Sequence, residues 1–322
     1  MKELTEIRIN GTDIHLQDNL VRSSILPEKT SELNRNIIFK GNTVVEGPVF
    51  GNRIEVRQGP LEVQGAAFTQ NELYVATDAA GEITFRKCVG SANSIVSRGD
   101  KARLMFLADI NAKSVALTNA FVAGSIYADD ITLDNCVVIG GVFATQDAEI
   151  RSSMIGTFNA PSVRLSGINY LLLPSAFSVE PVNAAPGTCL FNLSLADLGA
   201  LYKQLPQAED SGKIRIDLNV DELLSTLAGE EMTKVLRSYT VIGKVLAADL
   251  VNTDKFQNHF LLTAAALGPQ LLKTYDIGND RNGKPATLTV EKIREFLFDI
   301  LHGKIEIRDM SGSFNISDIT GR

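Results

Sequence analysis

Three histidines, His15, His259 and His302, are the first candidates for metal binding or proton transfer in this chain. Histidine is the commonest metal ligand, and its imidazole titrates near neutral pH, so metal-dependent and acid–base enzymes rely on it heavily. The three lie far apart in the sequence, and no motif joins any two of them. We therefore expect neither a histidine metal site nor a histidine catalytic base.

An adjacent pair of acids, Asp129-Asp130, resembles the carboxylates with which polysaccharide hydrolases work. Such a site needs further polar partners, and no histidine or arginine stands at matching positions in the segments on either side. Aspartates between short apolar segments are typical of turns, where their side chains bond to nearby backbone. We interpret the pair as a solvated corner between strands.

The glycine-rich segment Gly278-Asn-Asp-Arg-Asn-Gly-Lys284-Pro285 partly fits two ligand-binding motifs. As a phosphate-binding loop it fails at Pro285, where a hydroxyl must reach Mg²⁺. As a calcium loop it places Gly278 and Thr289 at the first and twelfth positions, where carboxylates are needed. We interpret the segment as a polar turn ahead of a helix that Thr289 caps.

The chain has three cysteines, Cys88, Cys136 and Cys189, which are widely spaced and form no C-x-x-C pair. This pattern predicts neither a disulfide framework nor a zinc site. Cys136 is expected to be a small core residue rather than a reactive thiol, because Ala120 and Ser152 stand at corresponding positions of neighbouring segments. The sequence thus predicts no catalytic, cofactor-binding or metal-binding residues and no cofactor.

Composition narrows the class of protein further. The 322 residues are 44% hydrophobic and 21% charged, which is typical of folded globular chains. A net charge of −7 and no cluster of Lys and Arg argue against a nucleic-acid surface. We see no signal peptide and no apolar run of about 18 residues, so we expect no transmembrane segment and a cytoplasmic location.

An internal repeat organises the middle of the chain. Gly124, Gly140 and Gly156 are sixteen residues apart (140 − 124 = 16; 156 − 140 = 16), and Ile126-Tyr127-Ala128 returns as Val142-Phe143-Ala144. In rows of sixteen, apolar residues and alanines align in two columns: Ile110, Ile126, Val142 and Phe158, and Ala112, Ala128, Ala144 and Ala160. Fixed-period similarity of this kind indicates stacked structural units.

Within one row, apolar residues alternate over short stretches that Asp, Asn and Gly pairs separate, which indicates short strands joined by turns. Such strands bury a core if each row forms one coil and successive coils stack in parallel about 4.8 Å apart. The sequence therefore predicts a mainly β fold, a parallel β-helix over residues 41–170. Its hand is expected to be right, as for most parallel crossovers. Looser repeats extend it upstream: Gly47-Pro48-Val49-Phe50 is echoed by Gly65-Ala66-Ala67-Phe68, and Ile54-Glu55-Val56 by Leu73-Tyr74-Val75.

Two stretches, Val-x-Gly-Ser-Ile-Tyr-Ala-x-x-Ile-x-Leu (122–133) and Val-Ile-Gly-Gly-Val-Phe-Ala (138–144), resemble the core repeat of the bactofilins. These are polymer-forming bacterial cytoskeletal proteins. The resemblance covers residues 41–170 and implies a right-handed, three-sided β-helix whose ends meet to build filaments without nucleotide.

The rest of the chain follows other patterns. Residues 1–40 are expected to form a hairpin and cap, since Asn10-Gly11 is a strong hairpin signal. A linker, residues 171–190, precedes a mainly helical α+β domain at 191–322, with helical spacing over 220–275 and a helix over 290–301. Two related phrases, Gly212–Asp217 and Gly303–Arg308, predict short strands that pair.

These observations favour a non-enzymatic structural scaffold. In this hypothesis the β-helix self-associates end to end through its terminal coils, and the C-terminal domain recruits another protein. Two alternatives remain: a monomeric adaptor whose solenoid is capped by residues 1–40 and Leu171-Leu172-Leu173, and, third, a β-helix enzyme.

Overall fold

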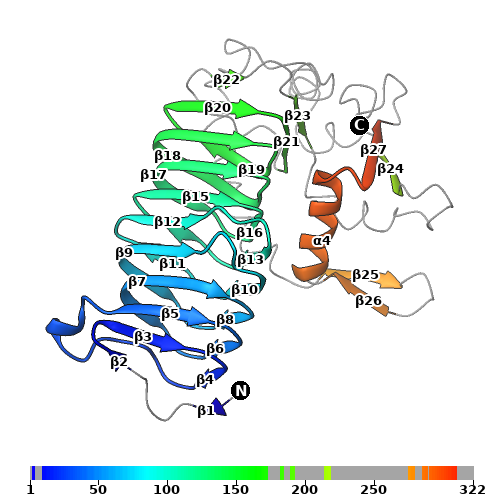
Figure 1. Ribbon diagram of the computed structural model, residues 1–322. Coiled ribbons are helices and arrows are strands. Elements are labelled where there is room, and N and C mark those ends of the chain that lie inside the picture. Colours follow the sequence, from blue (N-terminus) through cyan, green and yellow to red (C-terminus); the bar gives the residue numbers. More distant parts are fainter. Residues whose placement is uncertain are drawn as a thin grey trace. The chain divides into compact units, whose positions relative to one another are not determined.

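The computed structural model of the chain describes residues 2–3, 9–172, 182–184, 189–192, 214–218, 275–279, 285–288 and 290–309. The main element is a parallel β-solenoid of about eight turns (Figure 1). The chain divides into two compact units, residues 1–149 and 150–322. Each is described below by itself.

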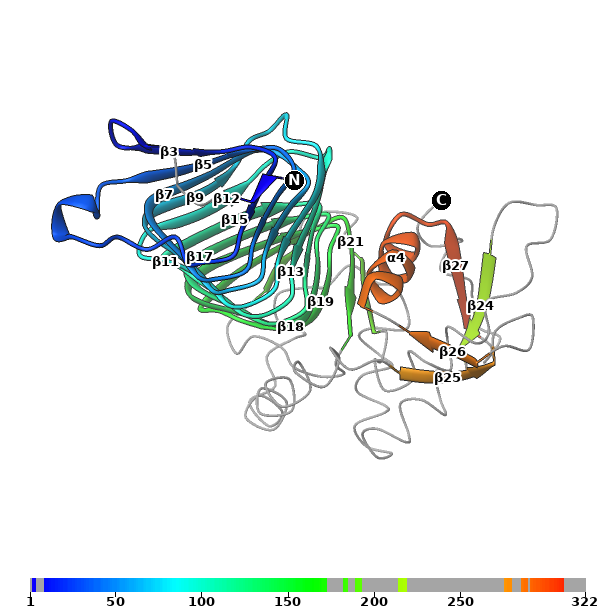
Figure 2. The same cartoon turned by 90° about the horizontal axis from the view of Figure 1, so that it is seen from below.

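The first unit winds its strands into coils with three sides, which we call faces A, B and C (Figure 2). Face A consists of β1 (Lys2–Glu3), β4 (Asn19–Val21), β6 (Thr43–Val45), β8 (Leu61–Val63), β10 (Gly81–Phe85), β13 (Ala102–Phe106) and β16 (Ala120–Val122). The short strands of face B are β11 (Val89–Ser91) and β14 (Ile110–Asn111). Those of face C are β3 (Asp13–Leu16), β5 (Asn36–Lys40), β12 (Ser94–Ser97) and β15 (Ser114–Thr118).

Longer strands turn the corners between faces. β7 (Val49–Gln58), β9 (Ala67–Val75) and β17 (Ile126–Asp134) pass from face B to face C, and β18 (Val137–Arg151) runs from face A into the second unit's first residues. A 3-10 turn, η1 (Thr30–Glu32), lies in the segment between β4 and β5, which extends beyond the outline of the other coils (Figure 2).

Strand register confirms the repeat that the sequence predicts. Ile110 pairs with Ile126 in parallel strands, so one coil is sixteen residues there. Upstream, Val49 pairs with Ala67 and Ile54 with Leu73, eighteen and nineteen residues on. Each similar phrase therefore lies directly on its copy in the neighbouring coil.

Inward-facing residues form the core. Ile110, Ile126 and Val142 are all fully buried, as the column of apolar residues predicts. Phe85 and Phe106, which pair in β10 and β13, stack inside the core with ring centroids 5.3 Å apart. The outward Met105 of β13 and Phe121 of β16 are buried as well, so faces B and C carry most of the exposed ladders of this part of the solenoid.

Close backbone approach explains the recurring glycines. A Cβ atom on Gly124 would lie 2.6 Å from backbone atoms of Ala108 and Asp109. One on Gly140 would lie 2.6 Å from the carbonyl oxygen of Gly124. Contacts this short exclude any side chain, so the sixteen-residue glycine spacing follows from the stacking of one coil on the next.

A different residue type supplies the left-handed backbone at another corner. Asn119 and Asn135 adopt φ of 54° and 53°, which asparagine tolerates better than most residues. The Asn135 side-chain amide donates to Asn119 Oδ1. In the second unit Ser152 also has a positive φ, 43°, and so lies at a corner rather than in a core column with Cys136, as the row alignment had placed it.

Parallel pairing begins upstream of residue 41 in the described part of the chain. β3 pairs with β5, and β4 with β6, so residues 13–21 already belong to a coil. The hairpin expected at Asn10-Gly11 is present: β2 (Ile9–Asn10) pairs antiparallel with β3, and Gly11 has φ of 61°.

The second unit contains further strands in the same parallel pattern. β19 (Met154–Asn159) pairs with β21 (Ile168–Leu171), β20 (Ser162–Ser166) with β22 (Val182–Ala184), and β21 with β23 (Cys189–Asn192). The two related phrases of the sequence pair with each other, as predicted. Their strands, β24 (Ile214–Leu218) and β27 (Ile305–Asp309), run parallel.

One helix of this unit, α4 (Val290–Leu301), matches the predicted bounds and buries Ile293 and Leu297. An antiparallel pair, β25 (Tyr275–Asn279) and β26 (Pro285–Leu288), precedes it. The helical spacing over 220–275 falls outside the residues that the structure describes, except at Tyr275, where β25 begins. The proposed cap at Thr289 also lies outside them.

Candidate functional site

The acid pair Asp129-Asp130 forms a corner of the solenoid. Both backbone N–H groups donate to the carbonyl oxygen of Lys113 in the previous coil, at 2.9 and 3.2 Å. The Asp129 carboxylate accepts a hydrogen bond from Thr145 in the next coil. These bonds tie successive coils together. Within the described residues, no group of three or more His, Cys, Asp or Glu side chains is arranged to hold a metal ion.

The histidines lie on separate elements. His15 is in β3, next to Ile38 of β5, and its buried Nδ1 atom has no hydrogen-bond partner. His302 follows α4, and its ring centroid lies 5.6 Å from that of Phe298. His259 is outside the residues that the structure describes.

Cys136 is fully buried at the start of β18's coil. Its Sγ atom lies 3.3 Å from the carbonyl oxygens of Leu117 and Asp134. Burial disfavours the thiolate and raises the pKa of the Cys136 thiol to about 12. A thiol that stays protonated is a poor nucleophile, so Cys136 acts as a core residue. Cys88, by contrast, is exposed.

The glycine-rich segment at 278–285 joins two strands. β25 ends at Asn279 and β26 begins at Pro285, while residues 280–284 lie outside the described part. A phosphate-binding loop leads from a strand directly into a helix whose N-terminus faces the phosphates. Here an antiparallel strand follows Lys284, so the local fold disagrees with that motif.

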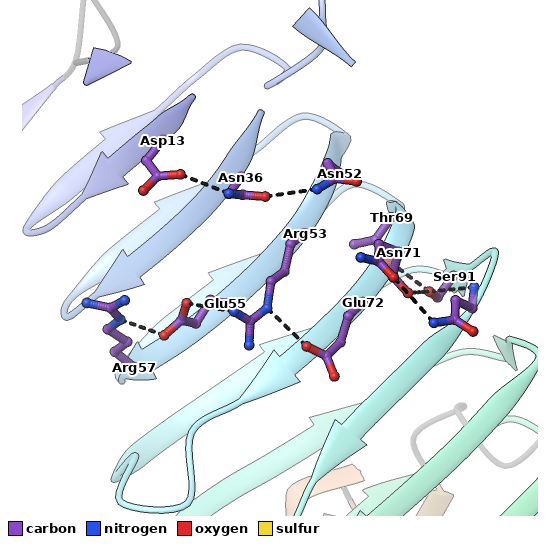
Figure 3. Close-up of polar contacts among 11 residues, drawn as sticks. Asp13, Asn36, Asn52, Arg53, Glu55, Arg57, Thr69, Asn71, Glu72 and Ser91 are labelled. Carbon is purple, nitrogen blue, oxygen red and sulfur yellow. Dashed lines mark hydrogen bonds and ion pairs between the residues drawn. The ribbon is translucent and has the colours of Figure 1, made fainter. Parts of the chain in front are cut away.

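A charged cluster on face C holds neighbouring coils together (Figure 3). Arg53 of β7 forms an ion pair with Glu72 of β9, with Nε and Oε2 3.0 Å apart, and its guanidinium lies over the Tyr74 ring. Arg57 and Glu55 pair at 2.6 Å along β7. Each charge has an opposite charge beside it, so the cluster has the character of an inter-coil tie rather than a site for a charged ligand.

Hydrogen-bonded polar side chains form similar ladders near the corners of the coils (Figure 3). Asn36 donates to Asp13 at 2.9 Å, and Asn52 donates to Asn36 at 3.1 Å. Inside the solenoid, the hydroxyl groups of Thr69 and Ser91 lie 2.9 Å apart. Stacked polar groups that satisfy one another stabilise the coil-to-coil register and leave little free bonding capacity.

The first coil is a candidate assembly site because it is a sheet edge. β1 covers face A with two residues, Lys2 and Glu3, and β2 covers face C with two. Glu3 is held by Arg22, whose Nε lies 2.8 Å from the carboxylate, but both side chains are largely exposed. An edge closed by such short strands presents unpaired backbone groups close to the core.

Face B carries a column of outward aromatic residues that was not predicted from the sequence as a site. Phe50 pairs with Phe68, and their rings stack at 5.3 Å. Further along the same face, Tyr127 stacks on Phe143, with ring centroids 5.2 Å apart. The repeated phrases of the sequence contain all four aromatics at one outward position, and this was the signal that could have revealed the column.

Comparison of the chain with protein-family models, curated proteins and solved structures finds no match. Among the residues that the structure describes, no helix combines the length and the apolar character that crossing a bilayer requires.

Proposed function

We propose that this chain is a non-enzymatic structural scaffold in the cytoplasm, a bactofilin-like solenoid that self-associates through its terminal coils. The C-terminal residues, 191–322, recruit another protein. The observation that carries this proposal is the parallel stack itself, in which every coil offers the next one a matching ladder and the first coil is closed only by two-residue strands. Such an edge can pair with another chain.

The proposed lack of catalysis is supported by the bonding of the polar residues. The acid pair, the Arg53 cluster and the asparagine ladders each bond to a neighbouring coil. A catalytic carboxylate, base or nucleophile needs a polar partner and space for a substrate. The Asp129 carboxylate, which was a candidate for chemistry, is instead engaged in holding the coils in register.

A monomeric adaptor is the second candidate, and the presence of β1 and β2 favours it. These strands, although short, occupy two of the three faces of the first coil. In this reading the solenoid is a rigid platform, and its faces rather than its ends bind partners.

Sedimentation velocity of the full chain over a range of concentrations, with negative-stain microscopy of the same samples, tests the proposal. We expect an average mass above that of one chain that rises with concentration, and elongated particles in the micrographs. A single species with the mass of one chain at every concentration would exclude the self-associating scaffold and leave the capped adaptor.

A further inference from the structure

An apolar stripe runs along face B of the first unit. In the described part of the chain, three large hydrophobic side chains are exposed: Leu26 (52%), Phe68 (41%) and Tyr127 (38%). Strand register places all three at the same outward position, in a column that we call the face B stripe: Leu26, Phe50, Phe68, Gly90, Asn111, Tyr127 and Phe143. Exposed apolar residues gathered on one line mark an interaction surface.

The aromatic rings of the stripe stack in two pairs. Phe50 and Phe68 stack with an interplanar angle of 18°, and Tyr127 and Phe143 with 17°. One face of each ring is thus covered by its partner in the stack. The ring edges and the remaining faces are available to a protein surface, and aromatic side chains contribute strongly to such contacts.

Two glycines, Gly90 within the stripe and Gly141 next to it, make room for its rings. A Cβ on Gly90 would lie 2.9 Å from the Phe68 ring, and one on Gly141 would meet the Phe143 ring. The rings therefore lie close to the sheet. The middle of the stripe, at Gly90 and Asn111, has no large side chain. A surface of this form is pre-organised, which lowers the entropy cost of binding.

Two opposite charges flank the middle of the stripe. Asp109, Asn111 and Lys113 are exposed and alternate with the buried Ile110 and Ala112. Asp109 and Lys113 therefore flank Asn111 on either side, with opposite charge. A two-fold axis parallel to the solenoid stack would reverse the strand direction, set Asn111 opposite Asn111, and bring Asp109 of each copy to Lys113 of the other. The same axis would place each aromatic opposite its own copy.

We propose that the face B stripe is a dimerisation surface for a second copy of this chain, related by that two-fold axis. Interfaces of this symmetry require a surface that is complementary to itself, and here both the apolar column and the flanking charges meet that requirement. Buried aromatic residues dominate the affinity of such interfaces, while the flanking ion pairs fix the orientation. The pairing is side to side and is independent of any contact through the terminal coils.

The first test is the mass of the full chain with the double substitution Phe68→Glu and Tyr127→Glu. We expect the dissociation constant of the dimer, measured by sedimentation equilibrium, to rise about a hundredfold, because charges would replace two central aromatic contacts. The matched control is Thr132→Glu, an exposed position on face C of the same strand, β17. It should leave the dimer intact, and unchanged circular dichroism of both variants would show that they fold.

The second test is a cross-link that only the proposed axis allows. In a Cys88→Ser background, Asn111→Cys is expected to form an intermolecular disulfide on mild oxidation, whereas Thr132→Cys is not. End-to-end contact does not bring the middle coils of two copies together, so this result separates the stripe from the terminal coils. An unchanged mass for the double variant, or the absence of the Asn111→Cys cross-link, would overturn the proposal. Binding of the monomer to insoluble polysaccharide through Phe68 and Tyr127 would also overturn the proposal.

Discussion

Two cysteines in different surroundings allow the core to be probed residue by residue. Cys136 is fully buried, and its thiol has a pKa of about 12, whereas Cys88 is exposed. Thiol reagents react with the thiolate, and at pH 9 the buried Cys136 thiol stays protonated. We expect a maleimide or disulfide reagent at this pH to modify Cys88 in the folded chain and to spare Cys136 until denaturant is added.

Peptide mapping by mass spectrometry identifies the labelled residue. A Cys88→Ser variant is the control, because its first 149 residues then hold only the protected thiol. Rapid labelling of Cys136 under native conditions would mean that the coil around it opens readily, and the packing described for this column would be wrong.

Some glycines of the solenoid lie against backbone and others against a side chain, and substitution by alanine should have a different effect on stability in the two cases. A Cβ on Gly140 would meet the backbone of Gly124, which cannot move without disturbing a whole coil. A Cβ on Gly90 would meet only the Phe68 ring, which can rotate away. We predict that Gly140→Ala lowers the free energy of unfolding by about 3 kcal/mol and Gly90→Ala by less than about 1 kcal/mol.

Urea titrations of both variants provide the measurement. The two substitutions add the same methyl group, so each serves as the other's control. Similar losses of stability would contradict the close coil-to-coil contact at Gly124 and Gly140.

The inward and outward side chains of one strand should likewise differ in how well they tolerate a charge. In β17, Ile126 and Ile131 point inward and are fully buried, while Thr132 is exposed. We predict that Ile126→Asp costs about 4 kcal/mol or more, because the column has no partner for a charge. Thr132→Asp should change stability by less than about 0.5 kcal/mol.

Thermal and urea unfolding of the two variants measure this difference. Equal tolerance of aspartate at Ile126 and Thr132 would contradict the assignment of inward and outward positions in β17.

Most of the solenoid could be predicted from its inward residues. The columns containing Ile126 and Val115 are visible in the sequence because burial restricts them to apolar types, and the structure pairs them as expected. Corners were harder to predict. Ser152 was assigned to the core column, but it is itself a corner residue with a positive φ, a role that small polar residues can share with glycine.

The first coil and the face B stripe were not predicted, for a related reason. β3 and β4 lie in coils with long corner segments, so no fixed period links Ile14 to Ile37 in the sequence, although the two pair in the structure. Outward residues such as Phe68 and Tyr127 are free to vary, and only their register reveals that they form one column. In the second unit, helix α4 was predictable from its apolar spacing.

At the scale of the whole molecule, the short strands of the first coil bear on the end-to-end association that we propose. We predict that deleting residues 2–10, which removes β1 and β2, increases the average mass of the full chain in sedimentation velocity, because the edges of β3 and β4 become available to another copy. Glu3→Lys should act in the same direction, but less strongly, because it repels Arg22 and loosens only β1.

Glu28→Lys is the matched control, since it makes the same charge change in an exposed segment away from the strand edges. Its mass should equal that of the unmodified chain. If the deletion variant folds, as judged by circular dichroism, but does not associate more than the control, the short strands do not cap an assembly site.

The strict sixteen-residue spacing from Ile110 to Ile126 also bears on how the gene can change. In repeat proteins each unit contacts only its neighbours, so adding or removing one unit leaves the remainder intact. Duplication of sixteen codons, such as those for residues 126–141, would insert one further coil and lengthen the stack by about 4.8 Å. An insertion of one codon within a strand would turn its inward side chains outward. Evolution can therefore alter the length of this protein in whole coils far more easily than in single residues.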